Sequence, residues 1–143
     1  MGSYASFRNR FVSWRVVVAG ALLVVLAACS GPAAQGELHG NWEGSWTSDN
    51  EGTGSVSAEF THLGGALSGT VTIGGSPCLV TGTITGEVTG ANVAFGAAGP
   101  NDEIQFEATL TDDAMQGTYA VESGACAGDT GVFELQKLGL ASL

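Results

Sequence analysis

The fold is decided by the stretch Leu67-Ser68-Gly69-Thr70-Val71-Thr72-Ile73, in which apolar or small residues alternate with hydroxyl residues. Successive side chains of a β-strand point to opposite faces, so this period of two predicts a strand with one buried and one wet face. The abundance of threonine and valine agrees, because β-branched residues favour strands. Residues 80–87 repeat the pattern, which indicates two neighbouring strands of the same kind.

The same alternation recurs from Leu38 to near the end of the chain and predicts eight strands. No segment after the N-terminal apolar run has a helical period, so we expect an all-β fold there. The expected inward rows are Gly40, Trp42, Gly44, Trp46; Val56, Ala58, Phe60; Leu67, Gly69, Val71, Ile73; Val80, Gly82, Ile84, Gly86; Val93, Phe95; Ile104, Phe106, Ala108, Leu110; Met115, Gly117, Tyr119, Val121; and Gly131, Phe133, Leu135.

Clusters of Gly, Pro, Asn and Asp separate these rows and supply the backbone angles that tight turns require. The short spacing favours an eight-stranded antiparallel up-and-down meander over a Greek key, which needs a long crossover. Closing such a meander into a barrel removes its exposed edges. The predicted fold is therefore a closed all-β barrel that follows an N-terminal signal helix.

The N-terminal segment has the order of a signal peptide: arginines at positions 8, 10 and 15, then an apolar run of thirteen residues over 16–28. The run is short for a membrane-spanning helix, which needs roughly 20 residues. Its end, Leu26-Ala27-Ala28-Cys29, resembles the lipobox of bacterial lipoproteins. The resemblance implies a lipoprotein signal peptide over 1–28, lipidation of Cys29 and a lipidated tether over 29–37. The alternating rows then place the barrel domain over 38–143.

The same resemblance implies an exported protein of the cell envelope, anchored in the membrane through its N-terminal lipid. In a Gram-negative host, Ser30 after the cysteine is typical of outer-membrane sorting. In a host with one membrane, the protein would lie on the outer face of the plasma membrane.

If Cys29 carries lipid, Cys78 and Cys126 remain, and in an exported protein an even remainder favours a disulfide. The bond would close a loop of about 47 residues, for which chain entropy gives roughly 4 kcal/mol. The two cysteines fall in turns at the same end of the predicted meander. A zinc site is the alternative, but two cysteines without nearby histidines do not complete four ligands.

Charge excludes one class of partner. All fourteen acidic residues follow Cys29, whereas Lys137 is the only basic residue after it, so the formal charge of that part is −13. Phosphate backbones are bound by Lys and Arg, so nucleic acid is excluded as a partner. The same charge disfavours close contact of the domain with anionic lipid headgroups.

The opening Gly40-Asn41-Trp42 resembles the Gly-x-Trp with which lipocalin-like and avidin-like barrels begin. In that resemblance Trp42 closes one end of the barrel, and Trp46 could line a ligand site near the other. Glycines on the inner rows could leave a cavity, or they could permit the strong coiling that barrel closure requires. The candidate ligand-lining or core residues are Trp42, Trp46, Phe60, Phe95, Phe106, Tyr119 and Phe133.

Catalytic chemistry is not indicated. His39 and His62 are the only histidines and both are expected to be exposed, and we find no nucleophile motif, phosphate loop or His-Glu-x-x-His. Acidic turns such as 49–52 and 112–113 offer oxygen ligands of the kind calcium takes, but they lack the spacing of an EF-hand. We therefore predict a non-enzyme with no catalytic residues, no metal site and no cofactor.

Three functions remain open. The first is a non-enzymatic binding domain for a small apolar ligand held inside the barrel. The second is a protein-interaction module, such as a protease or lysozyme inhibitor, whose acidic loops meet a basic protein partner. The third is a structural envelope component. A deep internal cavity would favour the first, and a packed interior with an acidic rim would favour the second.

Overall fold

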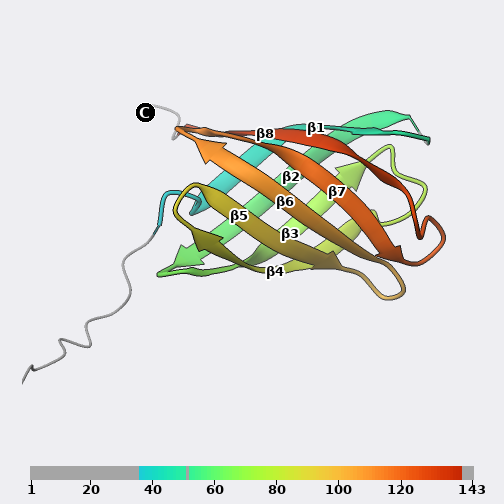
Figure 1. Cartoon of the computed structure of the whole chain (residues 1–143), viewed down its shortest axis with the longest axis horizontal. Helices are drawn as coiled ribbons and strands as arrows, with labels where there is room; N and C mark the ends of the chain where they lie inside the picture. The colour runs from blue at the N-terminus through green and yellow to red at the C-terminus, as the bar shows by residue number, and fades with distance from the viewer. Residues whose placement is uncertain (1–35, 51, 140–143) are drawn as a thin grey trace, which may run out of the picture. The chain divides into compact units, whose positions relative to one another are not determined.

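The computed structural model describes residues 36–50 and 52–139, which form a closed barrel of eight antiparallel strands in sequence order (Figure 1). The first and last strands pair with each other, which closes the barrel. The predicted fold class is thus confirmed, while the expected signal helix and the lipobox lie outside the described residues. The strands are β1 (Gly40–Ser48), β2 (Thr53–Leu63), β3 (Ala66–Gly74), β4 (Thr81–Thr89), β5 (Asn92–Ala98), β6 (Glu103–Thr111), β7 (Ala114–Ser123) and β8 (Thr130–Lys137).

Register places the alternating rows as predicted, with apolar side chains inside and polar side chains in solvent. Trp46 of β1 pairs with Gly54 of β2 and with Phe133 of β8, and Phe95 of β5 pairs with Phe106 of β6. All seven candidate aromatic residues lie inside, each at most 7% exposed. No helix in the described part is long and apolar enough to cross a membrane.

Stacked and edge-on rings fill the middle of the barrel. Phe95 stacks on Phe106 with ring centroids 4.6 Å apart, Phe133 meets Phe106 edge-on at 5.1 Å, and Phe60 meets Phe95 at 5.4 Å. Such aromatic pairs are stabilised by about 0.5–1.5 kcal/mol beyond the area that they bury. The interior is therefore a packed core at this level.

The inward glycines lie against neighbouring strands. A Cβ on Gly44, Gly69, Gly86 or Gly117 would overlap a backbone carbonyl oxygen of the adjacent strand. These residues therefore permit close approach of neighbouring strands and strong coiling of the sheet. Of the two roles expected for them, this is the geometric one. They do not line an internal cavity.

The start of the fourth strand differs from the prediction. Val80 was expected on the inner row, but it is 56% exposed, and β4 begins at Thr81. Leu79 is buried in its place, and its side chain lies against the sites where Gly82 and Gly99 would carry a Cβ. The cause is the loop over 75–80, which reverses the chain and breaks the alternation before the strand.

One end of the barrel is closed by the segment over 36–39 and by three two-residue turns. Leu38 is fully buried, and its carbonyl accepts a hydrogen bond from Nε1 of Trp42 at 2.9 Å. Trp42 thus lies at the closed end, as the Gly-x-Trp resemblance implied. The fold includes Gly36 and Glu37, because the amide of Gly36 donates to the carbonyl of His62 and Nζ of Lys137 donates to the carbonyl of Glu37.

The expected exposure of both histidines is wrong. His62 is 7% exposed, because the segment over 36–39 folds onto its ring, and its Nδ1 accepts the amide of Leu38 at 3.4 Å. His39 is half-buried, with Nδ1 enclosed and unpartnered in the described part. Both histidines are less exposed than expected because of the segment over 36–39, whose sequence has no strand or helix periodicity.

Candidate functional site

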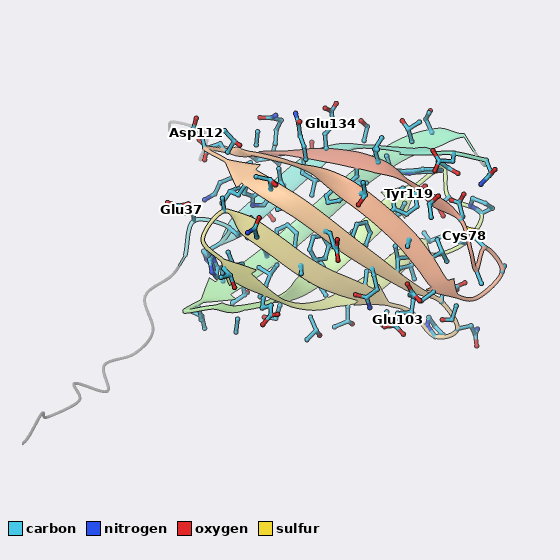
Figure 2. The ribbon with its side chains drawn as sticks, in the orientation of Figure 1. Glu37, Cys78, Glu103, Asp112, Tyr119 and Glu134 are labelled. Carbon is cyan, nitrogen blue, oxygen red and sulfur yellow. A yellow bond between two sulfur atoms is a disulfide. The ribbon has the colours of Figure 1, made fainter. Side chains whose placement is uncertain are left out.

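The end of the barrel opposite the segment over 36–39 carries the four longer connections, of four to six residues each. Figure 2 shows Glu37 at one end of the barrel and Cys78 at the other. Cys78 of the β3–β4 connection and Cys126 of the β7–β8 connection form a disulfide, with Cα atoms 5.8 Å apart. The predicted bond is present, and it ties two loops across this mouth of the barrel.

A buried carboxylate, that of Asp129, occupies the mouth. It immediately precedes β8, where its amide donates to the carbonyl of Cys126 and its carbonyl accepts the amide of Val121. These backbone bonds turn the side chain inward, and the residue is 9% exposed. The β7–β8 connection is therefore what places an acidic group over the core.

Three polar side chains donate to this carboxylate. Oδ1 of Asp129 accepts hydrogen bonds from Oγ of Ser48 at 2.7 Å and from Nδ2 of Asn50 at 3.3 Å. Oδ2 accepts one from the hydroxyl of Tyr119 at 3.2 Å. Ser48 and Asn50 lie more than 75 residues away in sequence. The cluster thus joins the end of β1 to β7 and to the start of β8.

The two ionisable groups of this cluster are shifted in opposite directions. Burial would raise the pKa of the Asp129 carboxyl, but hydrogen bonds from Ser48, Asn50, Tyr119 and the backbone of Thr130 outweigh it and lower that pKa. Burial raises the pKa of Tyr119 to about 12, assisted by the nearby carboxylate of Asp129. At neutral pH the mouth therefore holds an ionised carboxylate and a neutral phenol.

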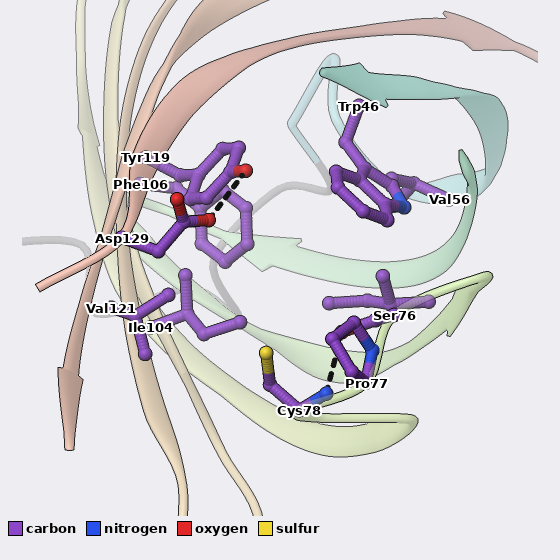
Figure 3. A pocket seen from close by; sticks show the side chains of 11 residues that line it. Trp46, Val56, Ser76, Pro77, Cys78, Ile104, Phe106, Tyr119, Val121 and Asp129 are labelled. Atoms are coloured by element: carbon purple, nitrogen blue, oxygen red, sulfur yellow. Dashed lines mark hydrogen bonds between the residues drawn. The ribbon is translucent and has the colours of Figure 1, made fainter. Parts of the chain in front are cut away.

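Beside this cluster lies a small hollow (Figure 3). Its cavity volume is about 30 Å³, and its walls come from β1, β2, β3, β6, β7 and the connections that carry Cys78 and Asp129. A cavity of this size holds one or two water-sized groups, whereas small-molecule sites typically measure about 300–1,000 Å³. The lining residues are Trp46, Val56, Ile73, Ser76, Pro77, Cys78, Ile104, Phe106, Tyr119, Val121 and Asp129.

The structure divides the seven aromatic candidates. Trp46, Phe106 and Tyr119 line the hollow, and the other four lie elsewhere in the core. Nε1 of Trp46 donates to the carbonyl of Gly74 at 3.0 Å, and its ring meets that of Tyr119 edge-on at 6.5 Å. Asp129 and Ser48 were not among the residues predicted from the sequence. The only signal for them was the inward Tyr119, whose hydroxyl needs a polar partner.

Larger hollows lie on the outer surface of the barrel. One of about 490 Å³ runs over β4 to β7 and is lined by Glu87 and Glu107 among small and hydroxyl residues. Another, of about 440 Å³, carries Asp49, Glu107 and Glu122. The hollows on the outer surface of the barrel therefore carry acidic side chains.

No metal centre is formed by the described residues: none of their His, Cys, Asp and Glu side chains gather in groups of three or more that could hold an ion. In the acidic turn over 49–52, the carboxylate of Asp49 accepts a hydrogen bond from the hydroxyl of Thr130. The expected lipidation site, Cys29, lies outside the described residues.

Fold and site together define a small up-and-down β-barrel with a filled interior and an acidic, disulfide-tied mouth. Neither a protein-family model nor a curated protein sequence matches the chain.

Proposed function

We propose that this chain is a bacterial lipoprotein, anchored in the cell envelope through Cys29, whose barrel is a non-enzymatic module that binds a basic protein partner. The lipobox resemblance supports the anchor, and the charge and shape of the barrel support the partner. The barrel itself is the part that the structure describes.

The filled interior is the observation that carries the choice of partner. A cavity of about 30 Å³ leaves no room for an enclosed apolar ligand, which a lipocalin-like carrier would need. Recognition must then use the outer surface and the mouth. This favours the protein-interaction function over the small-ligand function.

The acidic surface specifies the kind of partner. With fourteen acidic residues and one lysine after Cys29, the barrel attracts cationic surfaces and repels anionic ones. The outer hollows that contain Glu87, Glu107 and Glu122 would take basic side chains. Complementary charge accelerates association and sets specificity, so binding should weaken as salt rises.

The position of the mouth suits an anchored binding protein. The chain enters the barrel at Gly36, at the closed end, while Cys78 and Asp129 lie at the opposite end. A tether from Cys29 would therefore join the barrel at the end away from the mouth. The longer connections at that mouth would stay accessible to a partner.

Calorimetric titration of the mature lipidated protein, in neutral detergent micelles, against a lysozyme and a basic serine protease tests the proposal. We expect binding to at least one of them, with an affinity that decreases as salt increases. The matched control is the same enzyme with acetylated lysines, which keeps its fold and loses lysine charge. If the acetylated enzyme binds equally well, charge recognition is refuted. If native mass spectrometry of protein from its own host shows a retained apolar molecule, the small-ligand function is correct instead.

A further inference from the structure

Asp129 is a buried, ionised carboxylate to which the described domain supplies no cation. Lys137 is the only Lys or Arg after Cys29, and its Nζ donates to the carbonyl of Glu37 at the closed end. The two histidines also lie at that end, beside Leu38. Buried charges in proteins are usually paired, because removing a charge from water is costly. The hydrogen bonds from Ser48, Asn50 and Tyr119 keep this carboxylate ionised but bring no positive charge.

The hollow beside Asp129 has room for a small cation, and its walls are largely apolar and aromatic. Its volume of about 30 Å³ matches one or two water-sized groups, and an ammonium is of that size. Trp46, Phe106 and Tyr119 contribute rings to its wall, and an aromatic face attracts a cation, most strongly when it belongs to Trp. In Figure 3 the rings of Trp46 and Tyr119 and the carboxylate of Asp129 surround the same space.

We propose that this hollow binds a primary alkylammonium group, with the ammonium facing Asp129 and the alkyl stem leaving past Pro77, which lies exposed at the rim. The inference rests on the proposed binding of a basic partner, whose lysine side chain would carry the group. A free amine offers the same chemistry. A guanidinium is planar and larger than an ammonium, and it pairs best with both oxygens of a carboxylate at once. Both oxygens of Asp129 already accept hydrogen bonds and the hollow is small, so the site selects lysine over arginine.

The test uses the mature, isotope-labelled lipidated protein in neutral detergent micelles and n-butylammonium chloride as the probe, followed by NMR. After Cys29 the chain has two tryptophans, Trp42 and Trp46, whose indole N–H groups lie at opposite ends of the barrel. We expect a saturable shift of the Trp46 indole signal and none of the Trp42 signal. Equal shifts of both signals, or the same shift with sodium chloride at equal ionic strength, overturn the proposal.

Two further probes, one neutral and one with a larger charged head, test whether the hollow selects an ammonium. n-Butanol has a similar stem without the charge, and n-butylguanidinium has the charge on a larger head. We expect both to bind at least about tenfold more weakly than n-butylammonium, a difference of about 1.4 kcal/mol. Equal binding of n-butanol would show that the hollow selects apolar stems and not cations.

Variants locate the site. Asp129→Asn removes the charge and should lower the affinity for n-butylammonium by at least about tenfold, while Asp113→Asn, in an exposed turn at the closed end, should leave it unchanged. Because Asp129 also holds the mouth together, a second variant is needed. Pro77→Trp places a large side chain at the exposed rim and should block binding. Pro100→Trp, on another exposed turn at the same end, should not.

The two proposals fail separately. Binding of lysozyme or protease with no effect of n-butylammonium on Trp46 would overturn the ammonium site and leave the protein-interaction function intact. Binding of n-butylammonium with no affinity for either enzyme would support the site, assign it to a free amine and refute the lysine source.

Discussion

Tyr119 is the residue of the mouth whose ionisation can be followed by itself. It is 7% exposed, and its hydroxyl donates to the carboxylate of Asp129 at 3.2 Å. Ionising the phenol would remove this donated hydrogen and place a second negative charge beside the first. Burial and that neighbouring charge raise the pKa of Tyr119 to about 12, against an ordinary value of 10.0.

Stability should therefore decline at high pH. An unfolded chain releases the phenolic proton near pH 10, whereas the folded chain keeps it to about pH 12. The contribution is complete below the unfolded value and disappears as pH rises through the folded one, amounting to about 3 kcal/mol in the free energy of unfolding. Since Tyr119 is the only tyrosine after Cys29, phenolate absorbance of the mature protein reports it directly.

The matched control for this titration is Tyr119→Phe, which has no phenol to ionise. Chemical unfolding between about pH 10 and pH 12 should show a smaller loss of stability in this variant than in the wild type. A phenolate signal that titrates near pH 10 in the folded protein would contradict the prediction.

Residues that depend on distant contacts could not be predicted from the sequence. Asp129 looks like any turn aspartate, and its partner Ser48 is 81 residues away, so its burial follows only from barrel closure. His62 seemed exposed because it adjoins a Gly-Gly turn, yet the segment around Leu38 covers it. By contrast, the inward aromatic rows were predictable because each depends only on its own strand.

At the level of elements, alternation predicted all eight strands because one face of each is buried and the other is wet. The prediction failed at Val80, where a loop tied by the neighbouring Cys78 interrupts the period of two. The roles of the inner glycines needed the register. Gly117 pairs with Ala108, and the space for its side chain is occupied by the backbone of β6.

Replacement of Gly117 by Ala should therefore destabilise the barrel. The added Cβ would overlap the carbonyl oxygen of Glu107 and crowd Ala108, so β6 and β7 must separate. Overpacking of this kind costs about 1–3 kcal/mol. Chemical unfolding of the mature protein measures the change in free energy. Gly65→Ala is the matched control, because its new Cβ would lie 3.6 Å from the carbonyl oxygen of Val88, an ordinary contact. Equal effects of the two variants would contradict the assigned role of Gly117.

For the whole molecule, the sequence predicted that the sheet closes into a barrel, but not whether the interior of that barrel is filled or hollow. Eight alternating strands with short links allow either a filled barrel or one with room for a ligand. The outcome depends on how the rings of Phe60, Phe95, Phe106 and Phe133 pack together, and this packing follows only from the three-dimensional structure. A filled barrel of this kind places recognition on the outer surface and at the mouth.

The proposed anchor predicts the distribution of the whole protein in its cell. Cys29→Ala removes the lipid attachment site, and because each buried methylene contributes about 0.8 kcal/mol, losing the acyl chains should move the protein from the membrane to the soluble fraction. The matched control is a double variant, Cys78→Ala with Cys126→Ala, which removes the mouth disulfide and keeps Cys29, so it should stay with the membrane. Retention of Cys29→Ala in the membrane would mean that the apolar run over 16–28 anchors the chain directly. In that case the barrel of this variant would be held by a peptide segment and not by a lipid.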